Sequence, residues 1–222
     1  SDLVRPVRKM PEPKPAFQFV DLRQQHEVAQ LGIWVFLATE VLFFGGLILM
    51  YCVYRIGNPA GFADAARETQ IAIGTANTAV LLTSSFLVAW AVAAAHGGAG
   101  RLAAILLWIA ALLGVLFLVL KGIEYSIEYR EHLVPGLNFA RSGRNAASIG
   151  LFFSFYFVAT GVHALHVAIG IVVLGSVGFR AYHRAYSSRY HAPITVAGLY
   201  WHFVDVVWVF LFALIYLPGR SP

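Results

Sequence analysis

Five long apolar stretches constrain this chain more than any other feature. They cover about residues 28–54, 71–95, 102–123, 147–179 and 194–217. Each is long enough for a helix to cross the hydrocarbon core of a bilayer, which takes roughly 20 residues. A transmembrane barrel would instead need segments of about 10 residues with alternating polarity, and these runs are continuous. The sequence therefore predicts an all-α integral membrane bundle of five transmembrane helices.

Composition and charge support a membrane protein and argue against other classes. With 59% hydrophobic and 12% charged residues, the chain has too little polar surface to cover a soluble globule. Its 16 Lys and Arg residues are scattered over the tails and loops, which does not suit a nucleic-acid surface. Their weak bias predicts a cytoplasmic N-terminus and a periplasmic C-terminus. The single cysteine, Cys52, excludes an internal disulfide.

The chain divides into a polar tail and one membrane domain. Residues 1–27 carry four prolines between positions 6 and 15, so this tail is predicted to be non-helical. Residues 28–222 form the membrane domain, and no internal repeat suggests a second one. Between the first two spans, Asn58, Pro59 and Gly61 predict a short loop.

Ionisable side chains inside the fourth and fifth spans need compensation, because a charge in a bilayer is costly unless it is paired or hydrated. His163 and His166 lie three residues apart on one helix face, and His202 and Asp205 repeat that spacing. Imidazoles so placed could ligate a metal or haem. They could equally form an internal polar network, which is favoured because it requires no missing component.

Three carboxylates mark the first and third spans. Glu40 is the only charge near the middle of the first span, where an acid is expected to hold its proton. It could carry protons or serve as a neutral hydrogen-bonding group, and both interpretations stay open. Glu124 and Glu128 share a helix face at the end of the third span, where a solvated or interfacial position is favoured. The nearby Lys121 is interpreted as lying at the membrane edge.

A basic segment follows the fourth span. Arg180 and His183 are placed at the membrane edge, where they could contact phospholipid headgroups or only set the topology. Arg184 and Arg189 continue this segment as a loop.

Five motifs, one in each span, carry a family resemblance. The sequence resembles subunit III of the haem-copper oxidases, the family of cytochrome c and quinol oxidases. The motifs occur in the order of that family and run from residue 36 to residue 216: FLATEVLFFGG (36–46), NTAVLLTSS (77–85), GVLFLVLKGIEY (114–125), FVATGVHALHVAIG (157–170) and YWHFVDVVWVFLFALIY (200–216). Long members of the family have two further N-terminal spans, so this sequence is similar to the short five-helix bacterial form.

The resemblance implies roles for the polar residues. Subunit III of this family holds no haem, copper or other metal and has no catalytic residues. It implies that Glu40 corresponds to a buried carboxylate known for reacting with a hydrophobic carbodiimide. Arg180 corresponds to a residue at a lipid headgroup, with His183 as a neighbouring candidate. The remaining residues become candidates for an internal polar network and not ligands: Glu124, His163, His166, His202 and Asp205.

The resemblance also implies a function and partners. Subunit III is an accessory subunit of a respiratory terminal oxidase, which reduces oxygen to water and translocates protons in aerobic electron transport. It packs on subunit I, in a complex with subunit II, binds structural phospholipids, supports proton uptake and protects the enzyme from inactivation during turnover. The expected location is the bacterial cytoplasmic membrane. Two alternatives remain: an accessory subunit of a nitric oxide reductase, and a stand-alone proton-coupled transporter. The second usually shows internal repeats, which are absent here.

Overall fold

The computed structural model describes residues 22–143, 145–183 and 192–220, and these ranges contain six α-helices and no strand. Five of the helices are long and apolar enough to cross a membrane, which confirms the predicted all-α fold. The helices are α1 (Leu22–Gly57), α2 (Pro59–Glu68), α3 (Ile71–His96), α4 (Gly100–Arg130), α5 (Ala146–Tyr182) and α6 (Ala192–Tyr216).

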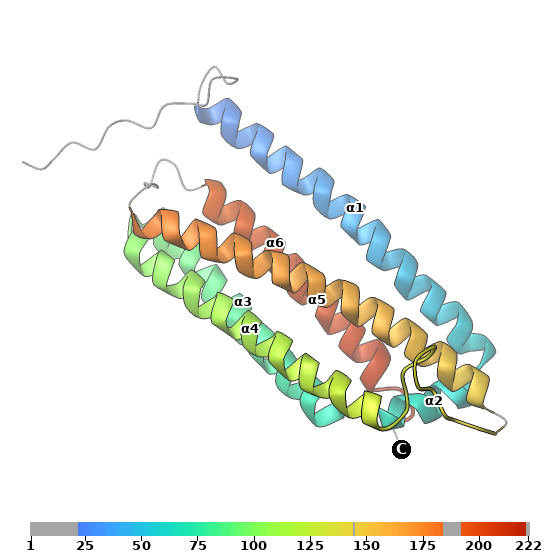
Figure 1. Cartoon of the computed structure of the whole chain (residues 1–222). Coiled ribbons are helices and arrows are strands. Elements are labelled where there is room, and N and C mark those ends of the chain that lie inside the picture. The colour runs from blue at the N-terminus through green and yellow to red at the C-terminus, as the bar shows by residue number, and fades with distance from the viewer. Residues whose placement is uncertain (1–21, 144, 184–191, 221–222) are drawn as a thin grey trace, which may run out of the picture.

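Four of the long helices form the core of the molecule. Helix α4 packs between α3 and α5, and α6 packs against both α3 and α5 to close the bundle. Helix α1 runs along the outside, where it contacts α5 and α6, and the short α2 lies across one end (Figure 1). The carboxyl ends of α4 and α6 and the start of α5 therefore lie at the end of the bundle that α2 covers.

A regular seam of buried residues runs down α3 and α4. Its members alternate in steps of three and four residues, the spacing that keeps one stripe of a helix against a partner. On α3 the buried positions are 74, 77, 81, 84, 88, 91 and 95. On α4 the same rhythm continues through 103, 107, 110, 114, 117, 121, 124 and 128. Small residues dominate the first half of the α4 seam, which lets neighbouring helices approach closely.

Helix α1 is held by a much narrower stripe. Its buried hydrophobic residues are Leu37, Phe44 and Tyr51, which are seven residues apart and so lie along one line of the helix. The Tyr51 hydroxyl donates a hydrogen bond to the backbone carbonyl of Leu214 on α6. The rest of α1 leaves large apolar side chains exposed, including Leu42 at 76% and Leu31 at 66%.

The structure corrects several predicted boundaries. The expected loop after the first span is mostly the helix α2, which begins at Pro59, a position where proline suits a helix because its missing N–H is not needed there. Helix α1 already begins at Leu22, so the end of the predicted tail is helical, while residues 1–21 lie outside the described residues. Helix α4 continues to Arg130, seven residues past the predicted end of the third span at residue 123.

The last described residues fasten α2 to the bundle. The Arg220 guanidinium donates hydrogen bonds to the backbone oxygens of Ala66 at 2.9 Å, Arg67 at 3.0 Å and Thr69 at 2.6 Å. These carbonyls belong to the end of α2, where helical partners run out. Gly219 reaches this position with φ of +70°, and an added Cβ would lie 2.8 Å from the Ala63 carbonyl oxygen.

Replacing Arg220 with alanine should loosen α2. Hydrogen bonds to a charged group contribute about 1.5–3 kcal/mol each when buried, and partial exposure places the expected loss at the low end. We expect faster protease cleavage between residues 59 and 69, measured on the full chain in detergent. The exposed Arg130 provides the control, and equal cleavage of Arg220→Ala and Arg130→Ala would contradict the role of the Arg220 contacts.

Candidate functional site

A buried ionic cluster lies at the end of the bundle that α2 covers. Three charged residues of the α4 seam form it, with Lys121 2% exposed and both Glu124 and Glu128 fully buried. Tyr156 of α5 and Tyr216 of α6 complete the cluster. We call these five residues the α4 ionic cluster.

Lys121 and Glu124 form a fully satisfied ion pair. The Lys121 Nζ donates to Glu124 Oε2 at 2.9 Å, to Tyr156 Oη at 2.9 Å and to Tyr216 Oη at 2.7 Å. An ammonium group has three protons, so this geometry uses all of them. The Tyr216 hydroxyl in turn donates to Glu124 Oε1 at 2.7 Å. The ammonium also lies 4.5 Å from the centre of the Tyr156 ring, where the ring face attracts a cation.

The solvated or interfacial interpretation of Glu124 and Glu128 is wrong, and Lys121, which was placed at the membrane edge, is buried as well. All three side chains are buried between α4, α5 and α6. The sequence does contain a signal for this burial, because positions 121, 124 and 128 continue the three-and-four spacing of Gly114 and Phe117. Sequence analysis missed Lys121, Tyr156 and Tyr216 as members of a polar site.

Glu40 and His166 form a second polar contact, between α1 and α5. His166 Nε2 lies 3.1 Å from Glu40 Oε2, and His166 Nδ1 lies 2.9 Å from the Val162 carbonyl oxygen. Because a carbonyl can only accept, Nδ1 carries a proton. The bond between Nε2 and Glu40 therefore contains one further proton, held either by the acid or by the imidazole. Phe44 packs edge-on against His166 at a centroid distance of 5.2 Å and helps to shield the pair.

The other predicted network residues have separate surroundings. His163 is fully buried between the rings of Phe117 and Trp208, and neither of its nitrogens has a partner among the described residues. His202 Nδ1 lies 2.6 Å from the Ser85 hydroxyl of α3. Asp205 is 5% exposed, and its Oδ1 atom is buried without a hydrogen-bond partner among the described residues. The five residues predicted to form one network therefore have separate contacts in the structure: Glu124, His163, His166, His202 and Asp205.

Within the described ranges, no three His, Cys, Asp or Glu side chains come close enough together to hold a metal ion. His163 and His166, which share a helix face, have different neighbours.

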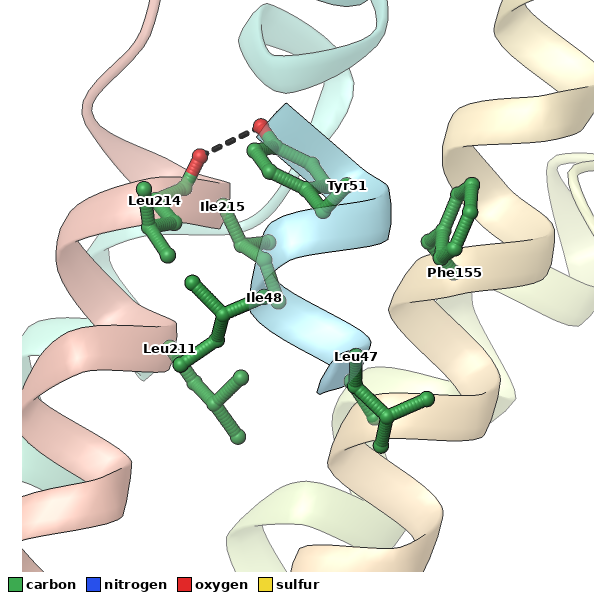
Figure 2. Close-up of a pocket in the computed structure, with 8 residues that line it drawn as sticks. Leu47, Ile48, Tyr51, Phe155, Leu211, Leu214 and Ile215 are labelled. Atoms are coloured by element: carbon green, nitrogen blue, oxygen red, sulfur yellow. Dashed lines mark hydrogen bonds between the residues drawn. The ribbon is translucent and has the colours of Figure 1, made fainter. Parts of the chain in front are cut away.

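An apolar pocket lies between α1, α5 and α6. Figure 2 shows Tyr51, Ile48 and Leu47 of α1 on one side, Phe155 of α5 on another and residues of α6 on the third. The hydroxyl of Tyr51 is occupied by its bond to Leu214. A shallower groove with the same character continues along α1 and α5, lined by Leu47, Met50, Leu151, Ser154, Phe155 and Val158. Both hollows are suited to hydrocarbon, not to a polar ligand.

Comparison with known proteins identifies the family. The family profile described as "Cytochrome c oxidase subunit III" matches residues 23–220. The chain belongs to the cytochrome c oxidase subunit III family. Cytochrome c oxidase subunit 3 of Thermostichus vulcanus is 33% identical over 203 residues, 90% of this chain and 93% of the relative. That of Synechocystis sp. is 34% identical over 194 residues, 86% of this chain and 76% of the relative.

A third relative agrees with this assignment. A protein named "Probable cytochrome c oxidase subunit 3" from Nocardia farcinica is 31% identical over 191 residues, 85% of this chain and 87% of the relative. The resemblance found in the five motifs is therefore confirmed. This subunit III is a membrane protein and an accessory part of a cytochrome c oxidase complex.

The lipid-headgroup candidates of this subunit III lie at the opposite end of the bundle from the α4 ionic cluster. Arg180 and His183 are exposed at the carboxyl end of α5. The His183 ring packs on Phe179 at a centroid distance of 4.5 Å. Arg184 and Arg189 lie outside the described residues. An exposed guanidinium can reach a phosphate at the membrane surface, so the headgroup role stays a prediction.

Proposed function

We propose that this subunit III supports the oxidase without carrying out redox chemistry, by holding phospholipids against subunit I and keeping that surface packed. The observation that carries the proposal is the apolar groove along α1 and α5, together with the broad exposed apolar face of α1. A hydrocarbon chain can fill such a hollow at little cost, because every lining surface is apolar. The haem and copper belong to partner subunits in this proposal.

The proposal extends to both membrane surfaces. Arg180 and His183 would bind phospholipid headgroups at the cytoplasmic end, at the opposite end of α5 from the hollow lined by Phe155, with the N-terminus cytoplasmic and the C-terminus periplasmic in a bacterial cytoplasmic membrane. Glu40, paired with His166, would fix α1 against α5 beside the lipid. Subunit I is the main contact, and subunit II belongs to the same complex. The oxidase reduces oxygen to water with proton translocation, and subunit III sustains proton uptake by its catalytic partner.

The relatives reported above favour this role over the alternatives raised from sequence. They are named as subunits of cytochrome c oxidase, whereas none of those names refers to a nitric oxide reductase or a transporter. Three functions are to be distinguished: a subunit of an oxidase, a subunit of a nitric oxide reductase and a transporter. Purification through a tag on this chain, followed by a reduced-minus-oxidised haem spectrum, distinguishes them. A copurifying oxidase subunit I supports the proposal, while a colourless chain that transports protons in liposomes would overturn it.

Removing this chain from the oxidase should leave the initial rate of oxygen reduction almost unchanged and make the activity decay during turnover. The reason is that the catalytic site stays intact while its lipid-covered surface loses support. The measurement is oxygen consumption against the number of turnovers, for the complex with and without subunit III. Decay curves that coincide would contradict the protective role.

A charge reversal tests the lipid contact in the intact complex. Arg180→Glu should lower the amount of phospholipid that copurifies and speed the decay. Arg101→Glu makes the same charge change at an exposed position at the start of α4, the same end of the bundle, and serves as the control. Equal lipid content in the two variants would contradict a specific role for Arg180.

A further inference from the structure

The α4 ionic cluster contains more negative charge than its only cation can balance. Lys121 is the one basic residue in the cluster, whereas Glu124 and Glu128 both contribute carboxyl groups. The ion pair of Lys121 and Glu124 is complete, since each ammonium proton and both Glu124 oxygens are hydrogen-bonded. Glu128 is therefore left without a cation to donate to it.

The surroundings of Glu128 confirm this imbalance. Both of its oxygens are buried and lack a hydrogen-bond partner of ordinary geometry among the described residues, although the Tyr156 hydroxyl lies nearby. Its charged neighbours are Lys121, Glu124 and Glu131, of which the two glutamates repel a further negative charge, and Tyr125 and Tyr216 also lie near it. An unpaired carboxylate in such a position costs far more free energy than its protonated form.

The position of Glu128 also allows exchange with water. It lies two residues before the end of α4, or about 3 Å along the helix axis. The chain turns immediately afterwards at His132, with φ of +56°, and Leu133 folds back so that its N–H bonds to the Glu128 carbonyl. The Leu133 side chain is fully buried. Because Glu128 lies so near the end of the helix, local opening of this last turn is the shortest route between its carboxyl group and water.

We propose that the α4 ionic cluster is a proton-binding site, in which Glu128 holds one exchangeable proton beside the neutral pair of Lys121 and Glu124. The proton comes from water at the end of the bundle where α4 and α6 end, and returns to it. The Glu128 carboxyl group is the only group in the cluster that gains and loses this proton. This site is separate from the contact of Glu40 with His166, and its existence does not depend on the proposed oxidase function.

Infrared spectroscopy of the full chain in nanodiscs tests the proposal directly. With ¹³C-labelled glutamate, the wild-type chain at pH 7 should show a carbonyl band of a protonated carboxylic acid that shifts when water is replaced by D₂O. Because a protonated Glu40 would absorb in the same region, the band is measured in Glu40→Gln, where it should persist. Adding Glu128→Gln, which keeps the size and neutrality of the side chain, to Glu40→Gln should remove it.

Three results would overturn the proposal. The first is an unchanged band when Glu128→Gln is added to Glu40→Gln, which would assign the proton elsewhere. The second is the absence of the band from Glu40→Gln, a variant that retains Glu128, which answers the question even if the double variant fails to fold. The third is a band that does not shift in D₂O, since a proton isolated from water is not exchangeable.

Discussion

Replacing Lys121 with methionine should destabilise the folded chain by about 3–5 kcal/mol, the usual cost of removing one partner of a buried ion pair. Methionine fills a similar volume, so the loss is mainly electrostatic. It leaves the Glu124 carboxylate buried with only the Tyr216 hydroxyl as a donor. The measurement is the free energy of unfolding of the full chain, from titration with a denaturing detergent followed by tryptophan fluorescence.

Two further variants separate lost charge pairing from lost packing. The double variant Lys121→Met with Glu124→Gln removes both charges together, and should recover most of the stability, because replacing a whole buried pair is often close to neutral. Arg101→Met removes an exposed cation from the first turn of the same helix and should have little effect. A double variant no more stable than Lys121→Met would contradict the ion pair as the source of the loss.

Replacing Gly170 with valine should disrupt the centre of the bundle at a cost of about 1–3 kcal/mol or more, the range typical of overpacking. An added Cβ at Gly170 would lie 2.8 Å from two ring carbons of Trp201. The ring cannot retreat easily, because its adjacent Cη2 atom meets Gly114 of α4, where an added Cβ would lie 2.7 Å away. Its Nε1 also donates to the Ser84 hydroxyl at 3.0 Å. Detergent titration of the unfolding transition measures the loss.

Gly175 provides the matched control for that substitution. It lies five residues further along α5, and an added Cβ there would meet no atom within 4 Å. Gly175→Val should therefore unfold close to the wild-type midpoint. If both valine variants lose the same stability, the cause is the helix itself and not the contact with Trp201.

The surroundings of Trp201 show which features the sequence pattern predicts and which it does not. Sequence analysis placed Gly161–Gly170 and Tyr200–Trp208 inside two apolar spans, which is where the structure has them, in α5 and α6. It had no means of bringing Trp201 between Gly114 and Gly170. That contact joins three helices, and its partners lie 31 and 87 residues away in sequence.

In the candidate sites too, the individual residues were predicted from the sequence but their partners were not. The ionisable residues within apolar spans were identifiable because each is costly in a bilayer, and Glu40 and His166 do meet. Their pairing was not predicted, since it joins the first long helix to the fourth. The burial of Lys121 was not predicted, because a lysine near the end of a span usually extends its ammonium group to the interface. Its burial follows instead from the tyrosines of α5 and α6, which satisfy its protons.

By itself, the sequence determined the class of this protein, its five long helices and its family. Those properties depend on the length and polarity of continuous segments, which act locally through transfer into the bilayer. Only the tertiary structure decided that α2 is a helix tied down by Arg220, that the α4 ionic cluster is buried, and that Glu128 is left without a cation. These depend on the rotation and register of packed helices, because a turn of one helix by a single residue moves a side chain from the protein interior to the lipid.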